Sequence, residues 1–145
     1  MPSARPRILL VCRSFVKRRS DGKLLLIRRA GADRHLPGLW ECPGGKLEEG
    51  QDLASVQERE VEEETGLLVK PILQLVYADS CVLTAGPYAK LPYVVIFGIS
   101  EPVGGELALS HEHDAYQWVT YTNLCAETCT LEVLKAAVVL EKHLK

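Results

Sequence analysis

The chain has 145 residues, a length that we expect to form one domain, over residues 1–145, with a single hydrophobic core. Its net charge of −2 and its hydrophobic content of 47% are ordinary values that argue against a basic nucleic-acid-binding protein. No apolar run approaches the length that a membrane-spanning helix needs. Five cysteines, an odd number, favour reduced thiols and a cytoplasmic location over a disulfide framework.

The first part of the chain predicts a β-hairpin. Residues 7–16 and 23–29 are rich in apolar side chains, and the Asp21-Gly22 pair between them is a typical hairpin turn. The second strand ends at Arg28 and Arg29. This pair is either a charged strand end or, in the case of Arg29, a group that binds a substrate phosphate, because a guanidinium fits phosphate geometry. The loop over residues 30–39 is placed to border a substrate cleft.

Residues 44–67 predict a glycine-rich loop followed by a helix. Asp52 stands where a helix N-cap is expected, and Gly66 is placed to end the helix in the left-handed conformation. Between them, Glu60, Glu63 and Glu64 have i, i+3 and i+4 spacing. Their carboxylates therefore converge on one face of the helix within about one turn.

This carboxylate face predicts a metal site. Like charges at this spacing destabilise a helix unless a cation lies between them. Because Leu53 and Val56 project on the same side, the face should turn towards the protein interior rather than towards water. Several carboxylates with only oxygen donors suit Mg²⁺, or alternatively Mn²⁺. The alternative interpretation is an ordinary solvated acidic face.

Beyond this helix the sequence predicts more strands and a final helix. The expected strands cover residues 72–83, 91–100, 106–109 and 116–120, and the helix covers residues 130–144. Tyr77, Tyr93 and Phe97 lie on two of these strands and are candidates to stack on a nucleobase. Aromatic residues in strands nevertheless belong more often to the core.

The segment from Gly45 to Leu67 resembles the Nudix box, a signature of hydrolases that cleave nucleoside diphosphates linked to another group. The matching positions are Gly45, Arg59, Glu60, Val61, Glu63, Glu64, Gly66 and Leu67. Gln51 departs from the pattern, which has glutamate there. By resemblance that glutamate pairs with the arginine at the position of Arg59. We therefore expect the Gln51 amide oxygen to accept a hydrogen bond from Arg59, with weaker support for the loop than a carboxylate provides.

The resemblance implies a fold and a set of site residues. The implied fold is the α+β Nudix fold, a mixed β-sheet sandwiched between helices as an α/β/α sandwich. Glu60, Glu63 and Glu64 are implied as ligands of Mg²⁺, and Glu63 and Arg59 as members of the catalytic group. The segment over residues 40–46 is similar to the MutT-like branch, which implies the carbonyl of Gly44 as a further metal ligand.

Two more candidates come from the MutT-like branch. The Arg-Arg-Ala sequence at residues 28–30 resembles that branch and supports phosphate binding by Arg29. Glu112, six residues before Trp118, matches a position where MutT-like enzymes place an acid outside the box. Glu112 is thus a candidate metal ligand or general base. The alternative is that it belongs to an ordinary polar loop.

These features predict a Mg²⁺-dependent pyrophosphohydrolase that converts a nucleoside triphosphate, canonical or oxidised, to the monophosphate and pyrophosphate. We expect a nucleotide as substrate and neither a nucleic acid nor a membrane as partner, and a homodimer stays open. One alternative is hydrolysis of ADP-ribose or dinucleoside polyphosphates, although Val82, Leu83 and Thr84 replace the markers of those subfamilies. Another, supported by Gln51, is a non-catalytic domain that binds a nucleotide. The base-binding asparagine of MutT-like enzymes has no clear counterpart near residues 128–130.

Overall fold

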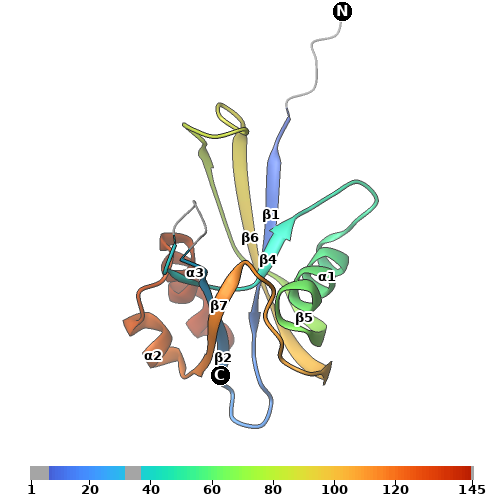
Figure 1. Cartoon of the computed structure of the whole chain (residues 1–145), viewed down its shortest axis with the longest axis vertical. Coiled ribbons are helices and arrows are strands. Elements are labelled where there is room, and N and C mark those ends of the chain that lie inside the picture. The colour runs from blue at the N-terminus through green and yellow to red at the C-terminus, as the bar shows by residue number, and fades with distance from the viewer. Residues whose placement is uncertain (1–6, 32–36, 145) are drawn as a thin grey trace, which may run out of the picture.

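Helices cover both sides of a pair of β-sheets in the computed structural model, which describes residues 7–31 and 37–144. Helix α1 (Leu53–Thr65) lies on one side, and α2 (Tyr121–Ala126) and α3 (Leu131–Leu140) lie on the other (Figure 1). A short 3₁₀ turn, Glu141–His143, follows α3. The α+β class and the helix–sheet–helix arrangement predicted from the sequence are confirmed. Within the described residues, no helix is long and apolar enough to cross a membrane.

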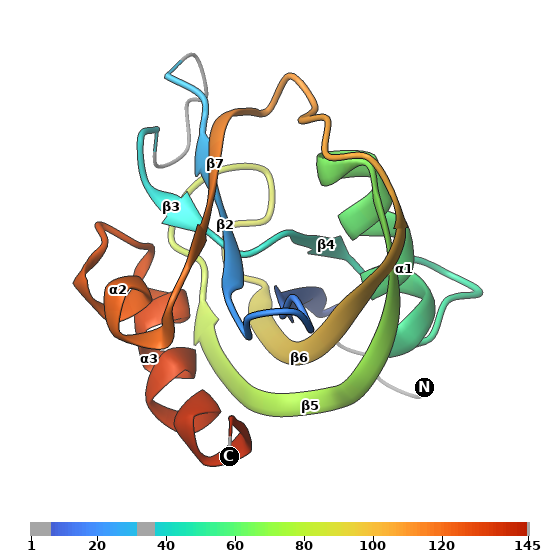
Figure 2. The same cartoon turned by 90° about the horizontal axis from the view of Figure 1, so that it is seen from below.

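The strands form two sheets rather than the single sheet that we predicted. The larger sheet has the order β4-β1-β6-β5 and is mixed, because β1 (Leu9–Val16) runs parallel to β6 (Pro92–Gly105) and antiparallel to β4 (Gly44–Lys46). Its edge strand β5 (Leu67–Val82) curves from the side of α3 to the side of α1 (Figure 2). The smaller, antiparallel sheet has the order β3-β2-β7 and comprises β3 (Trp40–Glu41), β2 (Leu24–Arg29) and β7 (His113–Val119).

The predicted hairpin between β1 and β2 is correct only at its turn. Gly22 has a φ of +70°, and the Arg18 amide donates to the Lys23 carbonyl at 2.8 Å. Beyond one bridge between Lys17 and Leu24, the two strands separate and join different sheets. The apolar run of β2 explains this separation. Its side chains alternate between two core clusters, so both faces of the strand are buried.

The strand predicted over residues 106–109 is wrong. This segment follows the end of β6 and runs along the C-terminal end of α1 instead. The amides of Ala108 and Ser110 donate to the carbonyls of Thr65 (2.8 Å) and Glu64 (3.1 Å). The last carbonyls of a helix have no partner within it, so a neighbouring loop can satisfy them. As a result, the loop that precedes β7 lies beside the acidic helix.

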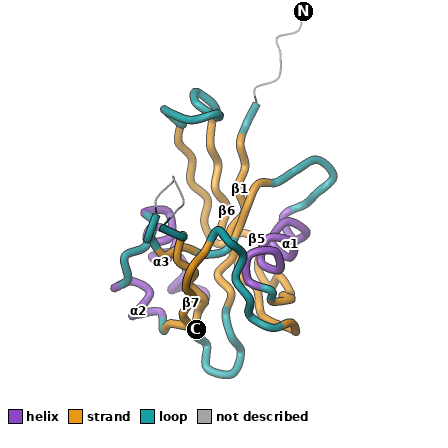
Figure 3. The backbone as a smooth tube through the Cα atoms, viewed as in Figure 1, coloured by secondary structure: helices purple, strands orange, loops and turns teal. Residues whose placement is uncertain are grey.

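Other boundaries differ by several residues. β5 begins at Leu67 and β6 ends at Gly105, so both strands are longer than predicted, while α3 ends at Leu140. β7 begins at His113, three residues before its expected start, and α2 was not predicted. The loops that follow β4 and β5 project from the same end of the larger sheet (Figure 3). Part of the loop expected to border the cleft, residues 32–36, lies outside the described residues.

Candidate active site

Helix α1 begins and ends where its capping residues predict. The Asp52 carboxylate accepts hydrogen bonds from the Ser55 amide (2.8 Å) and the Ser55 hydroxyl (2.6 Å). At the other end, Gly66 has a φ of +77° and donates its amide to the Glu62 carbonyl at 2.8 Å. The helix is therefore fixed at both ends, and its glutamates are presented from a rigid element.

The three glutamates of the predicted metal site differ in exposure. Glu64 is only 8% exposed, and the Glu60 side chain is 14% exposed. The side chain of Glu63 is 62% exposed. The inward-facing interpretation therefore describes Glu60 and Glu64, whereas Glu63 lies at the outer rim of the same face.

Two glycines bring the β4 segment against these carboxylates. A Cβ atom at Gly45 would lie 2.4 Å from the Glu60 carboxyl carbon, so only glycine allows this approach. The Gly44 amide donates to Glu64 Oε2 at 3.3 Å. The structure thus places Gly44 beside Glu64, where the resemblance implies a carbonyl ligand.

The expected hydrogen bond from Arg59 to Gln51 is not made. Arg59 Nη1 instead donates to Glu48 Oε2 at 3.2 Å, and its Nη2 donates to Glu60 Oε1 (2.8 Å) and to the Lys46 carbonyl (3.3 Å). The Gln51 amide oxygen accepts a hydrogen bond from the backbone amide of Glu48 at 3.0 Å. A carboxylate three residues before Gln51 therefore supplies the negative charge that position 51 lacks.

Positive charge compensates the buried carboxylates of α1 only in part. Burial raises the pKa of Glu64 well above its ordinary value, and Arg13 only partly offsets the effect. Burial also raises the pKa of Glu60, although the hydrogen bond from Arg59 opposes this rise. The negative charges of Glu63 and Glu112 raise the pKa of Glu60 further. Glu112 is thus close enough to Glu60 to influence its charge, although the two are far apart in the sequence. Burial and mutual repulsion together favour a cation among these groups.

The donor chemistry of this cluster fits a hard divalent ion, because every candidate ligand offers oxygen. In the side-chain arrangement of residues 7–31 and 37–144, no three His, Cys, Asp or Glu residues are grouped closely enough to hold a metal ion. Arg59 holds the Glu60 carboxylate and the Gly44 amide holds that of Glu64, so the two acids are bound to different partners. Metal binding at this face therefore requires rotation of side chains but no movement of the backbone elements.

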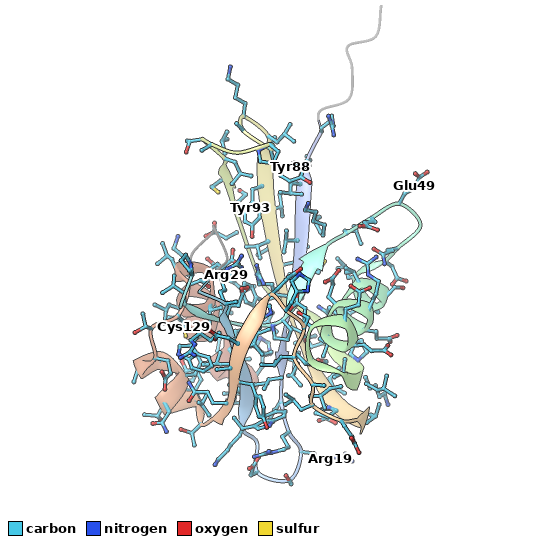
Figure 4. All side chains as sticks on the ribbon, in the orientation of Figure 1. Arg19, Arg29, Glu49, Tyr88, Tyr93 and Cys129 are labelled. Carbon is cyan, nitrogen blue, oxygen red and sulfur yellow. The ribbon has the colours of Figure 1, made fainter. Side chains whose placement is uncertain are left out.

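A cavity of about 730 Å³ is lined by residues of β1, β2, β4, β5, β6, α3 and the loop between β5 and β6. Four basic residues line it, Arg13, Arg29, Lys46 and Lys135. Lys46 directly follows Gly45, and its ammonium group also contacts the hydroxyl and the ring of Tyr88, with 4.3 Å from Nζ to the ring centroid. Figure 4 shows Arg29, Tyr93 and Tyr88 in succession towards the tip of the β5–β6 loop. A cavity of this size is typical of small-molecule sites.

Arg29 is not a solvated strand end. Its side chain is largely buried, and Nη1 donates to both carboxylate oxygens of Glu41, at 3.0 and 2.6 Å. Arg13 Nη1 donates to the same carboxylate at 3.1 Å. Glu41 therefore fixes two guanidinium groups beside the cavity.

The structure places one of the three predicted base-stacking residues, Phe97, in the core and another, Tyr77, against it. Phe97 is fully buried against Phe15, and the ring of Tyr77 packs on Phe97 with 6.4 Å between ring centroids. Among the described residues, the tyrosines that line the cavity are Tyr93 and Tyr88. Tyr93 is on the same face of β6 as Phe97 but nearer the start of the strand. Of the three candidates for base stacking, Tyr93 is therefore the one that lines the cavity.

Sequence reasoning also missed the charged network of Arg13, Glu41 and Glu132, of which Glu41 is buried and the other two are partly buried. Arg13 Nε donates to Glu132 Oε1 at 2.6 Å, and its Nη1 donates to Glu41. The sequence contains one signal for this network. Arg13 interrupts the apolar strand over residues 9–16, and a charge in a buried strand requires an ionic partner.

Comparisons with known proteins agree with the geometry. A family model described as NUDIX domain matches residues 8–139. The chain is 34% identical over 117 residues to a protein named octanoyltransferase from Myxococcus xanthus, covering 80% of this chain and 32% of that protein. It is 38% identical over 103 residues to a MutT-like protein from Streptomyces ambofaciens, covering 70% and 58% respectively. The chain thus spans less than two thirds of either curated relative.

Among solved structures, the crystal structure of a MutT protein from Methanosarcina mazei Go1 has the same fold. The TM-score is 0.79 with 25% sequence identity, and the match covers 99% of both chains. The fold is therefore shared over almost the whole length of both chains.

Proposed function

Because this chain belongs to the Nudix family and is similar to its MutT-like members, we propose that it is a divalent-metal-dependent pyrophosphohydrolase. Its substrate is a nucleoside triphosphate, which it cleaves to the monophosphate and pyrophosphate, with Mg²⁺ as the metal. One observation carries this proposal. The buried carboxylates of Glu60 and Glu64, whose pKa values are raised, lie against two glycines of β4. The last residue of that strand, Lys46, lines the cavity with Arg29. An anionic site whose charge is only partly compensated is thus connected to a basic cavity through adjacent residues of β4.

Glu60, Glu63 and Glu64 hold the metal in this proposal, with the Gly44 carbonyl and Glu112 as further oxygen donors. When bound, a divalent ion neutralises phosphate oxygens and lowers the pKa of a coordinated water molecule. Arg59 positions Glu60 through its 2.8 Å hydrogen bond and ties the loop to the helix through Glu48. These two contacts of Arg59 keep Glu60 and the loop in place when the substrate binds.

The remaining chemistry belongs to residues around the cavity. Arg29 and Lys46 bind the phosphates, whose charge they offset. Water attacks a phosphorus atom, the anhydride P–O bond breaks, and pyrophosphate leaves with the bonding electrons. Glu63 and Glu112 are the exposed carboxylates near Glu60, and one of them accepts the proton of the attacking water.

The structure weakens the argument for a non-catalytic domain. That argument depended on Gln51, since glutamine lacks the charge that supports Arg59. Arg59 nevertheless has a carboxylate partner in Glu48, so the substitution at position 51 removes no ion pair. The catalytic interpretation therefore does not require a glutamate at position 51.

The experiment that tests this function is turnover of a substrate panel with Mg²⁺. The panel contains canonical and oxidised nucleoside triphosphates, ADP-ribose and dinucleoside polyphosphates, with products identified by chromatography. We expect monophosphate and pyrophosphate from a triphosphate, and a loss of at least about a hundredfold in kcat for Glu63→Gln, in the range of general base catalysis. Cleavage of ADP-ribose alone would overturn the substrate assignment.

Glu62→Gln is the matched control, because Glu62 is exposed on the same helix and belongs to no part of the proposed site. It should leave kcat within about twofold of wild type, as a surface change away from the site does. A folded wild-type protein that binds a triphosphate for hours without forming product would contradict the enzymatic proposal.

A further inference from the structure

The loop that joins β5 to β6, residues 83–91, forms one wall of the cavity. The residues of this loop that line the cavity are Leu83, Ala85, Gly86, Pro87 and Tyr88. Tyr88 lies beyond Tyr93 towards the tip of the loop (Figure 4). Most of the other lining residues belong to β-strands and to α3. A movement of this loop would therefore open or close the cavity without any change in the sheets.

The loop has a defined shape of its own. The Leu83 amide donates to the Leu91 carbonyl at 3.3 Å, and the Lys90 amide donates to the Leu83 carbonyl at 2.7 Å. Lys90 has a φ of +68°, in the left-handed region that residues other than glycine rarely adopt. These hydrogen bonds close the loop on itself, so that it can move as one unit about the ends of β5 and β6.

One polar contact joins this loop to another element. The Lys46 ammonium group donates a hydrogen bond to the Tyr88 hydroxyl and lies 4.3 Å from the centroid of the Tyr88 ring. Within residues 7–31 and 37–144, no other hydrogen bond or ion pair connects residues 83–91 to a residue outside the loop. Lys46 is therefore the residue through which the position of the loop is fixed.

Lys46 is also bound to the acidic helix. Its carbonyl accepts a hydrogen bond from Arg59 Nη2 at 3.3 Å, and the same nitrogen holds the Glu60 carboxylate at 2.8 Å. Its neighbour Gly45 lies against that carboxylate as well. The backbone of Lys46 is thus fixed at the candidate metal site, while its side chain reaches the loop.

The Lys46 ammonium group can bind the loop and a phosphate at the same time. An ammonium group has three N–H donors, and the Tyr88 hydroxyl accepts from one of them. Lys46 lines the cavity, so its other donors can reach a ligand there. A lysine side chain normally loses much conformational entropy when it is ordered. Because Tyr88 orders this side chain before a ligand arrives, less of that entropy is lost on binding.

We propose that residues 83–91 form a lid over the phosphates of the substrate, and that Tyr88 holds the lid closed through Lys46. This inference rests on the proposed function, because it takes Lys46 as a ligand of those phosphates. Tyr88 is a positioning residue, since it acts through Lys46 and does not touch the reacting atoms. Lid closure and phosphate binding reinforce each other, because each one orders the same ammonium group.

Binding measurements test this coupling separately from catalysis. The probes are the α,β-methylene analogues of adenosine, guanosine, cytidine and uridine triphosphate, which cannot be cleaved at that bond. They are titrated calorimetrically with Mg²⁺ present, and the analogue that binds most tightly is used throughout. Tyr88→Phe keeps the ring but removes the hydroxyl that accepts from Lys46. We expect it to weaken binding about five- to twentyfold, in line with the loss of a partly exposed hydrogen bond to a charged group.

A double variant shows whether Tyr88 acts through Lys46. In Lys46→Met the Tyr88 hydroxyl has no ammonium group to hold. Adding Tyr88→Phe to that variant should therefore change the dissociation constant by less than about twofold. An equal loss of affinity in both backgrounds would show that Tyr88 acts independently of Lys46, and would overturn the proposal.

Hydrogen exchange of residues 83–91 measures closure of the lid itself. Backbone amides exchange more slowly where local opening becomes rarer. In wild type, the bound analogue should slow the exchange of these residues by at least about fivefold. In Tyr88→Phe saturated with the same analogue, the slowing should be less than about twofold. Exchange rates in wild type that the analogue leaves unchanged would contradict the existence of a lid.

Tyr116→Phe is the matched control. Tyr116 is 50% exposed on β7 and is not among the residues that line the cavity, and its hydroxyl makes no hydrogen bond in the described part of the chain. Its dissociation constant and its exchange rates over residues 83–91 should equal those of wild type. A loss of affinity equal to that of Tyr88→Phe would overturn the proposal. Thermal unfolding of each variant shows whether its data come from folded protein.

The lid and the proposed function fail in different ways. Absence of binding of all four analogues by folded wild type would overturn the lid. If wild type hydrolyses a triphosphate while Tyr88→Phe changes neither affinity nor exchange, the lid alone is contradicted. Binding and closure that both depend on Tyr88, in a protein that hydrolyses no nucleotide, would support the lid and contradict the proposed enzymatic function.

Discussion

Arg59 on α1 forms an ion pair with Glu48, at 3.2 Å between Nη1 and Oε2, across the loop that joins β4 to the helix. The pair explains how the loop tolerates glutamine at position 51. Gln51 bonds the backbone amide of Glu48 instead, so it positions the residue that carries the charge. The support for the loop is thus divided between two residues, one ionic and one neutral.

This division predicts unequal effects of substitution. Glu48→Gln should lower kcat/KM by about three- to fivefold, because an exposed ion pair contributes up to about 1 kcal/mol. Gln51→Glu should change it by less than about twofold, since Arg59 already has a carboxylate partner. Steady-state kinetics on the preferred triphosphate measures both. A gain in Gln51→Glu larger than the loss in Glu48→Gln would show that position 51 is the true partner of Arg59.

The contact between Gly45 and Glu60 gives a second prediction. Gly45→Ala places a methyl group 2.4 Å from the Glu60 carboxyl carbon, so either the loop or the carboxylate must move. We expect a loss of about 1–3 kcal/mol in the free energy of unfolding, as in other overpacked sites, together with weaker metal binding. Urea unfolding and Mg²⁺ titration of turnover measure the two effects.

Gly31→Ala is the control for this variant. A Cβ atom at Gly31 meets no atom within 4 Å, and the backbone there has no positive φ. Its free energy of unfolding should stay within about 0.5 kcal/mol of wild type. If Gly45→Ala behaves in the same way, the close approach to Glu60 is not important for the site.

Glu41 provides a prediction on pH. Burial raises its pKa, but Arg13, His113 and Arg29 outweigh that effect and lower the pKa to about 2. A carboxylate whose pKa is lower in the folded state than in the unfolded state stabilises the protein. For Glu41 this stabilisation is complete at pH values above the unfolded-state pKa of 4.5, and it is lost as the pH falls towards the folded-state pKa of about 2. The stabilising effect of Glu41 should therefore decline between these two pH values.

Glu41→Gln isolates this contribution. At pH 7 the variant should lose about 3–5 kcal/mol in the free energy of unfolding, because it leaves two buried guanidinium groups without their shared partner. The difference from wild type should shrink between pH 4.5 and pH 2, as followed by urea unfolding at several pH values. A difference that stays constant over this range would show that Glu41 stabilises the fold through packing alone. Asp21→Asn, which alters an exposed pair with Arg18, should cost less.

The sequence was most informative where the signal is local. The caps of α1 at Asp52 and Gly66 and the i, i+4 spacing of Glu60 and Glu64 are read within one helix, and the structure has them as predicted. The predictions that failed concern segments whose structure depends on tertiary contacts. The segment over residues 106–109 has strand-like alternation, but its amides bond the end of α1, which no local pattern reveals.

The charged network around the cavity was hidden for the same reason. Arg13 and Glu132 are 119 positions apart in the sequence, and Arg13 and Glu41 are 28 apart. Their pairing depends on β1 lying between β4 and β6, with α3 packed nearby, which is a property of the completed fold. A buried arginine in a strand predicts that a partner exists but not which residue it is.

The most direct test of the account is Mn²⁺ binding to the acidic face of α1, measured by electron paramagnetic resonance on wild type, Glu64→Gln and Glu62→Gln. Mn²⁺ is a spectroscopic substitute for Mg²⁺ at oxygen-donor sites. Our account predicts saturable binding by wild type and Glu62→Gln, and affinity at least about tenfold weaker in Glu64→Gln, in line with the loss of a metal ligand. Equal binding by all three proteins would contradict the assignment of α1 as the metal site.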